Sequence, residues 1–276
     1  MSRYAAMFER LGRVREGAFV PFCVLGDPTP SESAVLVATL AAAGADALEL
    51  GIPFSDPIAD GPTIQAANAR ALAAGVRPDD AFAIVAALRA AHPELPIGLL
   101  VYANLIEARG QAFYGRAAAA GVDSVLVADV PTLESPPFVA AATAAGIEPV
   151  LIATPDARPH ELAQIARESR GYTYVVSRRG VTGEDRPGAG VPSAIFAALR
   201  AAGAPPGLLG FGIGEPGQIR AALAAGAAGA ISGSAVVARI ERHIGDLGAA
   251  CRALTDFVQR MKAATALSED RAGPHA

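Results

Sequence analysis

The chain has 276 residues, a formal net charge of −4 and a hydrophobic content of 52%. Its weakly acidic balance excludes a protein that binds nucleic acid through a basic patch with interleaved aromatic side chains. Its length suits one large α/β domain or two small ones.

The N-terminal segment is predicted to be an amphipathic helix and not a signal peptide. Residues 2–12 mix Arg and Glu with apolar residues at helical spacing and lack an unbroken apolar core. No apolar run in the sequence reaches the roughly 20 residues needed to span a bilayer. Cys23 and Cys251 lie far apart without metal or redox spacing, so we expect free thiols in a reducing compartment. These observations predict a soluble, cytoplasmic protein.

A repeated helix–glycine–strand unit organises the rest of the chain. An alanine-rich stretch ends in Ala-Ala-Gly before five of the apolar runs, at Gly44, Gly121, Gly146, Gly203 and Gly226. Glycine adopts the left-handed conformation that ends a helix, after which the chain returns as a strand. With three further apolar runs, the pattern predicts eight strands, at residues 19–25, 47–50, 97–102, 124–128, 149–152, 172–177, 207–211 and 228–231.

Alternating strands and helices with short links predict a parallel sheet of right-handed βαβ units. Eight strands in a chain of about 250 residues are the number that closes a (β/α)8 TIM barrel. An open doubly wound sheet is the alternative, but no Gly-x-Gly-x-x-Gly turn follows the first strand. We therefore predict one barrel domain over residues 1–267, with the added N-terminal helix closing its bottom and an extra C-terminal helix over residues 244–265. Residues 268–276 are polar and are predicted to form a disordered tail.

Two links are too long for simple connections. They span residues 52–61, after the second strand, and residues 178–191, after the sixth. Long loops in a compact domain are usually functional or disordered. Both loops follow strands and therefore lie at the C-terminal rim, where barrel enzymes keep their chemistry.

Three glycine-rich stretches follow the last three predicted strands. They are residues 180–183, 210–214 and 232–234, and the last opens into a predicted helix over residues 235–244. Each stretch alone is typical of a plain turn. Together they stand where a barrel binds phosphate through backbone N–H groups and a helix N-terminus. The sequence therefore predicts a phosphorylated substrate.

Glu49 lies within the second predicted strand, between Leu48 and Leu50. A carboxylate there is costly to bury unless it is paired or used, and a structural ion pair is the alternative interpretation. Near the upper end of a barrel, desolvation would raise its pKa and suit it to proton transfer near neutral pH. Asp60, on the adjacent loop, could return over the same cavity.

Metal and Schiff-base chemistry are not predicted. The four histidines, His92, His160, His243 and His275, fall in predicted helices, links or the tail, whereas a Zn or Fe site needs a cluster of ligands. Asp56, Asp60 and Asp129 could hold Mg²⁺, but nothing distinguishes them as a set. The single lysine, Lys262, lies in the C-terminal helix, far from the rim where a Schiff base would need it.

What remains is carboxylate acid/base chemistry on a phosphorylated small molecule. Apolar residues at other strand ends would line a pocket for a flat aromatic group: Phe22, Leu100, Leu126, Ile152, Tyr174 and Phe211. For each of these taken singly, core packing is the alternative role.

Residues 48–61, Leu-Glu-Leu-Gly-Ile-Pro-Phe-Ser-Asp-Pro-Ile-Ala-Asp-Gly, resemble the signature of the tryptophan synthase α subunit family. The resemblance continues in residues 17–22, 97–104, 121–131, 171–174, 180–183, 210–213 and 229–235. It implies a (β/α)8 barrel with an extra N-terminal helix. It also implies retro-aldol cleavage of indole-3-glycerol phosphate to indole and glyceraldehyde 3-phosphate without a metal or a Schiff base.

The resemblance also implies roles for single residues. Glu49 would protonate the indole ring and then help to deprotonate the side-chain hydroxyl, and Asp60 would hydrogen-bond the indole N–H. Tyr174 would help to orient the site, and Thr182 would close over it and contact Asp60. The resemblance further implies a phosphate cradle of Gly183, Gly212, Gly233 and Ser234. Together with Phe22, Leu100 and Phe211 of the predicted pocket, these residues, Tyr174 and Thr182 are the predicted substrate-binding residues.

The family acts with a pyridoxal-phosphate β subunit in an αββα complex, and indole passes between the subunits. By resemblance, Asp56 and Pro57 lie on the partner-contacting surface, and no cofactor is expected in this chain. Arg179 and the charged residues 184–190 depart from the family pattern and bear on loop closure. A free-standing lyase and a catalytically weak regulatory subunit are the alternatives. Glu49 and Asp60 argue against the second, and the intact loop favours a subunit over the first.

Overall fold

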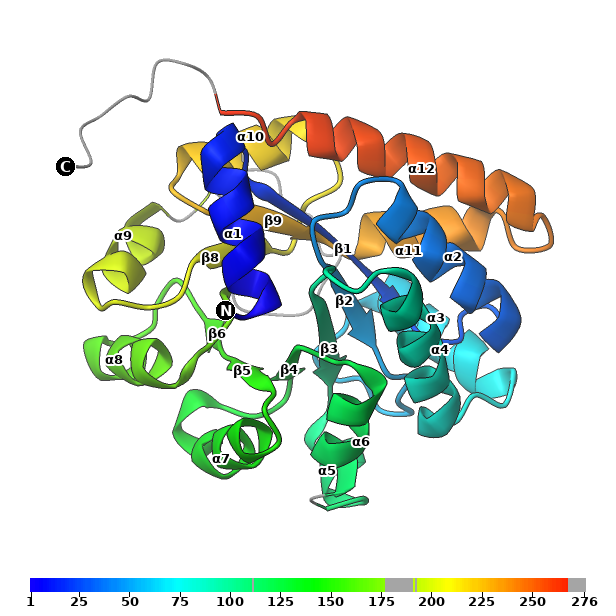
Figure 1. The fold of residues 1–276 in the computed structure, drawn as a ribbon, viewed down its shortest axis with the longest axis horizontal. Coiled ribbons are helices and arrows are strands. Elements are labelled where there is room, and N and C mark those ends of the chain that lie inside the picture. The colour runs from blue at the N-terminus through cyan, green and yellow to red at the C-terminus, as the bar shows by residue number, and fades with distance from the viewer. Residues whose placement is uncertain (111, 177–190, 192, 268–276) are drawn as a thin grey trace.

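The strands form one continuous parallel sheet in the computed structural model, which describes residues 1–110, 112–176, 191 and 193–267 (Figure 1). The sheet has nine strands in the order β5-β4-β3-β2-β1-β9-β8-β7-β6. Their bounds are β1 Ala18–Val24, β2 Leu48–Gly51, β3 Ile97–Val101, β4 Ser124–Val127, β5 Glu148–Val150, β6 Ile152–Ala153, β7 Thr173–Val176, β8 Gly207–Gly210 and β9 Gly229–Ser232.

The two ends of the sheet meet within one stretch of chain. β5 pairs with β4 and β6 pairs with β7, and only Leu151 separates β5 from β6. The Leu151 carbonyl accepts a hydrogen bond of 3.1 Å from the Tyr174 N–H. The sheet therefore closes on itself, which confirms the predicted (β/α)8 TIM barrel. The fifth predicted strand is interrupted at Leu151 and so appears as two.

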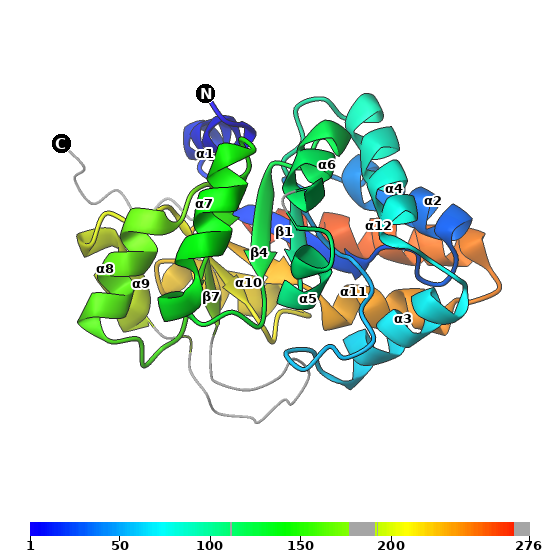
Figure 2. The same ribbon diagram turned by 90° about the horizontal axis from the view of Figure 1, so that it is seen from below.

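Helices surround the barrel (Figures 1 and 2). They are α1 Arg3–Val14, α2 Pro30–Ala42, α3 Pro62–Ala73, α4 Pro78–Ala91, α5 Ala103–Glu107, α6 Ala112–Ala120, α7 Pro136–Ala144, α8 Pro159–Glu168, α9 Ser193–Ala201, α10 Pro216–Ala224, α11 Ser234–Arg242 and α12 Leu247–Ala263, with a 3-10 turn at Thr132–Glu134. Within the described ranges, no helix is long and apolar enough to cross a bilayer. The predicted tail, residues 268–276, lies outside the described residues.

Local sequence signals explain where these helices begin and end. Proline occupies the first turn of α2, α3, α4, α7, α8 and α10, where its missing N–H costs no intrahelical hydrogen bond. The five predicted helix-ending glycines all have positive φ angles: Gly44, Gly121, Gly146, Gly203 and Gly226. This left-handed conformation is the one that lets each helix stop and the next strand begin.

α1 closes the end of the barrel where the strands begin. Tyr4, Met7 and Leu11 point from α1 into the inner core and are almost fully buried. The Tyr4 hydroxyl lies 3.0 Å from Ser124 Oγ at the start of β4, and its ring lies 5.3 Å from that of Tyr172. In Figure 2, α1 lies at one end of the barrel and α3 and α11 lie at the other.

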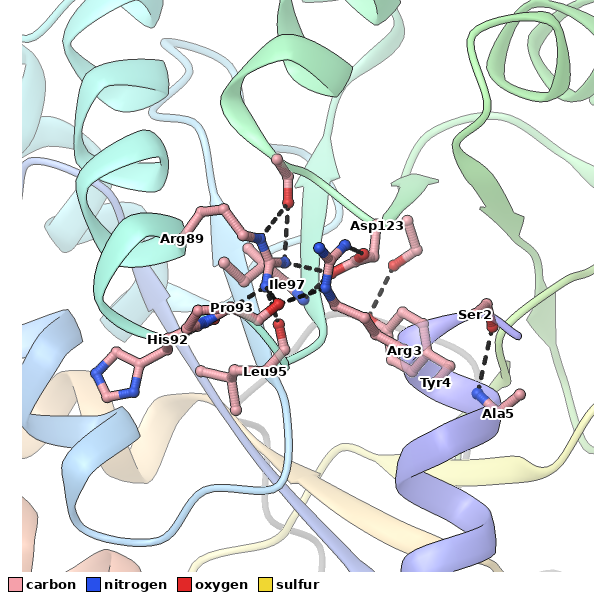
Figure 3. A network of polar contacts seen from close by, with 12 residues as sticks. Ser2, Arg3, Tyr4, Ala5, Arg89, His92, Pro93, Leu95, Ile97 and Asp123 are labelled. Carbon is pink, nitrogen blue, oxygen red and sulfur yellow. Dashed lines mark hydrogen bonds and ion pairs between the residues drawn. The ribbon is translucent and has the colours of Figure 1, made fainter.

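A network around Asp123 ties α1 to its neighbours (Figure 3). Arg3 Nη1 donates to Asp123 Oδ1 at 2.7 Å, and Arg89 Nη2 donates to Asp123 Oδ2 at 2.5 Å. Arg89 also donates to the Leu95 and Gly121 carbonyls, so α4 joins the same network. α1 and the hydrogen bonds around Asp123 lie at the end of the barrel where the strands begin. The opposite rim remains open for the candidate site.

Candidate active site

Glu49 projects from β2 into the barrel interior and is 1% exposed. The Tyr172 hydroxyl donates to Glu49 Oε1 at 2.5 Å, while Oε2 has no hydrogen-bond partner among the described residues. Burial raises the pKa of Glu49 to about 7, the negative charge of Asp60 adds to the rise, and the Tyr172 hydrogen bond opposes it. Glu49 is therefore able to give or take a proton near neutral pH.

Asp60 ends the loop that follows β2 and is also buried. The Tyr102 hydroxyl donates to Asp60 Oδ2 at 2.9 Å. Burial raises the pKa of Asp60 to about 6, and the hydrogen bond from Tyr102 limits that rise. At neutral pH the site thus holds one carboxyl near its midpoint and a second that is mostly ionised.

Both carboxylates line one cavity of about 480 Å³ at the C-terminal rim of the barrel. Its walls contain all six apolar residues predicted to form the aromatic pocket: Phe22, Leu100, Leu126, Ile152, Tyr174 and Phe211. Phe22 and Glu49 are register partners on β1 and β2, which places both on the inner face. A cavity of this size and mixed lining is typical of a small-molecule site.

The cavity lining also contains the described part of the predicted phosphate cradle. Gly212, Gly233 and Ser234 all line it, and α11 begins at Ser234. Gly212 follows Phe211 in a turn where both residues have positive φ angles, 70° and 67°. The first N–H groups of a helix have no intrahelical acceptor and favour an anion. Thr182, Gly183 and Arg179 lie outside the described residues, so their predicted roles stay predictions.

Several residues at the site were not identified from the sequence. Tyr172 and Tyr102 hold the two carboxylates, and Arg239 and Arg242 of α11 line the cavity. A signal existed for Tyr172, because it lies two residues before Tyr174 and alternation along a strand puts both on one face. The two arginines share a helix face with Ala235, at intervals of four and seven residues, which places them on the same wall.

The predicted partner residues lie outside the cavity, on the loop between Glu49 and Asp60. Asp56 is exposed and Pro57 is partly buried. Ile58, which no sequence pattern had marked, is 72% exposed at the same loop tip. The loop tip thus presents an exposed apolar side chain next to the two predicted partner residues.

The lone lysine lies at the opposite end of the barrel. Lys262 Nζ is 2.8 Å from carboxylate oxygens of both Glu16 and Asp46, which precede β1 and β2. Within the described ranges, no group of three or more His, Cys, Asp or Glu side chains is placed to hold a metal ion. Among the described residues that line the cavity, Glu49 and Asp60 are the carboxyls whose pKa is raised toward neutral pH.

The fold agrees with the comparison to known families. The family model described as tryptophan synthase alpha chain matches residues 8–266. The chain belongs to the tryptophan synthase alpha chain family. The tryptophan synthase alpha chain of Shewanella amazonensis is 57% identical over 267 residues, which are 96% of this chain and 100% of that protein.

Solved structures of tryptophan synthase give the same result. The crystal structure of the α subunit from Legionella pneumophila has a TM-score of 0.86 and 30% identity, and the match covers 96% of this chain and 98% of that chain. A chain of the α2β2 tryptophan synthase complex from Pyrococcus furiosus has a TM-score of 0.79 and 32% identity, over 90% of this chain and 98% of that chain. The likeness therefore extends over nearly the whole barrel.

Proposed function

We propose that this chain is the α subunit of tryptophan synthase and that it cleaves indole-3-glycerol phosphate to indole and D-glyceraldehyde 3-phosphate. The observation that carries the proposal is the convergence of Glu49, Asp60 and the start of α11 on one cavity, in a chain of this family. The apolar wall fits an indole ring, and the helix start fits the phosphate at the other end of the substrate.

The raised pKa of Glu49 suits it to act first as an acid and then as a base. Protonated Glu49 gives its proton to the ring carbon that bears the side chain, and the ring becomes a cation. The ionised carboxylate then takes the proton of the adjacent side-chain hydroxyl. As that oxygen forms the aldehyde carbonyl, the carbon–carbon bond breaks and its electron pair restores the neutral indole. The proton count closes, because Glu49 ends in the state in which it began.

Asp60 supports the cationic intermediate. Its lower pKa, about 6, keeps it mostly ionised while Glu49 is still half protonated. A carboxylate that accepts a hydrogen bond from the indole N–H stabilises positive charge on the ring, and such a contact is strongest where the cavity excludes water. Two carboxyls with separated pKa values thus take two roles.

We further propose that the chain works in an αββα complex, as the similar chain of the Pyrococcus furiosus α2β2 complex does. The exposed loop tip with Asp56, Pro57 and Ile58 is the proposed contact surface. Pyridoxal phosphate is assigned to the β chain and no cofactor to this chain, because proton transfer by Glu49 accounts for the cleavage. The free thiols of Cys23 and Cys251 support a cytoplasmic location.

The test is release of indole from indole-3-glycerol phosphate by the wild type and by Glu49→Gln. We expect the variant to fold and to lose roughly 10²- to 10⁴-fold in turnover, the usual contribution of a general acid/base. Glu94→Gln makes the same chemical change at an exposed residue outside the cavity and is expected to leave turnover unchanged. Near wild-type turnover by Glu49→Gln would rule out the proposed mechanism.

The same assay separates the subunit from a free-standing lyase. The wild-type chain is assayed alone and with a pyridoxal-phosphate β chain. A large stimulation of indole release by the β chain supports the subunit. Full activity alone, unchanged by the β chain, supports a free-standing enzyme of the same chemistry.

A further inference from the structure

Tyr102 joins the two ends of the loop that carries Asp60. It follows β3 and precedes α5, and it is 2% exposed. Its hydroxyl donates to Asp60 Oδ2 at 2.9 Å and accepts from the Ala59 N–H at 3.2 Å. Its ring stacks on that of Phe54, with a centroid distance of 5.0 Å and an interplanar angle of 21°. One side chain thus contacts the loop near its start and at its end.

The backbone at both ends of the loop is held by α3. The Phe54 N–H donates to Asn68 Oδ1 at 2.9 Å, and Asn68 Nδ2 donates to the Ile64 carbonyl at 2.9 Å. Gln65 Nε2 donates to the backbone carbonyl of Asp60 at 2.8 Å. These bonds fix the path of the chain but do not reach the Asp60 carboxylate. Among the described residues, the side chain that donates a hydrogen bond to this carboxylate is Tyr102.

We propose that Tyr102 is a positioning residue for the cleavage reaction, which aims the Asp60 carboxylate at the substrate and links it to the exposed loop tip. This inference rests on the proposed function. The Tyr102 hydroxyl holds Oδ2, and no side chain among the described residues donates a hydrogen bond to Oδ1, which we assign to the indole N–H. The hydroxyl also bridges Asp60 and Ala59, so a partner that moves the loop tip moves the carboxylate as well.

The groups around Asp60 determine how loss of the Tyr102 hydroxyl affects its titration. Among the described residues, Glu49 faces it from β2, Tyr174 from β7 and Tyr102 from the end of β3. Asp129 acts on Tyr102 and accepts a hydrogen bond from the Ala103 N–H. None of these groups carries positive charge. The hydrogen bond from Tyr102 lowers the pKa of Asp60 against burial, so its removal raises that pKa further.

The test compares Tyr102→Phe with a matched control. Tyr102→Phe keeps the ring and its stacking on Phe54 but removes the hydroxyl. Because Asp60 must be ionised, kcat/KM falls as pH falls through its pKa. On the acidic side of the plot of kcat/KM against pH (the acidic limb), we expect the midpoint to lie about one pH unit higher in Tyr102→Phe than in the wild type. This is the effect of one hydrogen bond to a charged group. This shift lowers the ionised fraction of Asp60 about two-fold at pH 7, and we expect kcat/KM to fall about ten-fold well below pH 6.

Tyr114→Phe is the control. Tyr114 is equally buried, lies outside the cavity, and has a hydroxyl without a hydrogen-bond partner among the described residues. Tyr114→Phe also loses one hydroxyl, but one that lies outside the cavity. Its rate and its pH profile are therefore expected to match those of the wild type. A purely structural role of Tyr102 would lower the melting temperature of Tyr102→Phe but leave its acidic limb in place.

A double-mutant cycle and an NMR titration complete the test. If Tyr102 acts through Asp60, Tyr102→Phe in an Asp60→Asn background costs no further rate. Carbon-detected NMR of the Asp60 carboxyl, with no substrate present, is expected to give a higher pKa in Tyr102→Phe than in the wild type. An unchanged limb together with an unchanged carboxyl pKa overturns the inference. A wild type that releases no indole contradicts the proposed function instead, and the NMR comparison then still decides whether Tyr102 holds Asp60.

Discussion

At the scale of single residues, the environment of Glu49 that suits it to proton transfer is unfavourable for stability. Among the described residues, the Tyr172 hydroxyl is the hydrogen-bond partner of this buried carboxyl, and burial together with the nearby charge of Asp60 raises its pKa to about 7. The same burial destabilises the ionised form of Glu49, which the second step of the proposed reaction needs. Active sites commonly exchange stability for function in this way.

Glu49→Gln is therefore expected to stabilise the fold increasingly as pH rises. The folded pKa of Glu49 is raised from 4.5 to about 7, so the folded chain keeps a proton that the unfolded chain has lost. The contribution of this proton to stability is complete below pH 4.5 and is lost as pH rises through 7. The full effect is roughly 3 kcal/mol.

Urea unfolding of the wild type and Glu49→Gln at about pH 5 and pH 8 measures this difference. We expect the advantage of the variant to be much larger at pH 8. Glu94→Gln, at an exposed carboxyl, is the control and is expected to show the same stability as the wild type at both pH values. An advantage of equal size at both pH values would mean that Glu49 ionises as freely in the fold as in the unfolded chain.

At the scale of elements, close contact between β1 and β9 depends on a residue without a side chain. Ala18 and Gly229 are register partners across these strands. A Cβ on Gly229 would lie 2.7 Å from the Ala18 backbone nitrogen and would overlap its carbonyl oxygen. β9 leads directly into Gly233 and α11, so this contact also sets the position of the described cradle residues.

Gly229→Ala is expected to destabilise the fold by about 1–3 kcal/mol, the usual cost of forcing an extra methyl into a packed interior. Gly115→Ala is the matched control, because Gly115 lies in α6 and a Cβ added there would have no neighbouring atom within 4 Å. It is expected to stabilise by about 0.5–1 kcal/mol, since alanine is the better helix former. Urea unfolding of both variants distinguishes them, and equal effects would contradict the close contact.

At the scale of the whole molecule, the two ends of the barrel have different tasks. The bottom is closed by α1 and by the Asp123 network, and it holds the lone lysine in ion pairs. The rim carries the cavity and, beside it, the exposed loop tip. The proposed contact with a β chain therefore lies next to the chemistry, where a product can pass directly to the partner.

Ile58→Asp is expected to weaken the complex with a β chain about ten-fold or more. Placing a charge on an apolar interface residue costs more than about 1 kcal/mol. The control is Val14→Asp on α1, at the opposite end of the barrel, where the native side chain is 56% exposed against 72% for Ile58. Titration of indole release with β chain gives both affinities. An unchanged midpoint for Ile58→Asp would place the partner surface elsewhere.

Local patterns along the chain were enough to predict the strands, the helix ends and the two carboxylates. Alternation and helical spacing arise between neighbouring residues, so they can be read without knowledge of the fold. The positive φ at Gly44 and the position of Glu49 within β2 follow from such local signals. The barrel prediction followed from the number of these units, because eight parallel strands of this kind close.

The side chains that hold the carboxylates could be identified only from the folded chain. Tyr172 is 123 residues from Glu49, and Tyr102 is 42 residues from Asp60. Tyr172, at the start of β7, reaches Glu49 of β2 because the closed sheet turns both side chains into the barrel interior. Tyr102, after β3, meets Asp60 because the loop after β2 folds back toward the end of β3. The 72% exposure of Ile58 depends on the same loop path. Contacts between distant segments depend on closure and register, which no local pattern encodes.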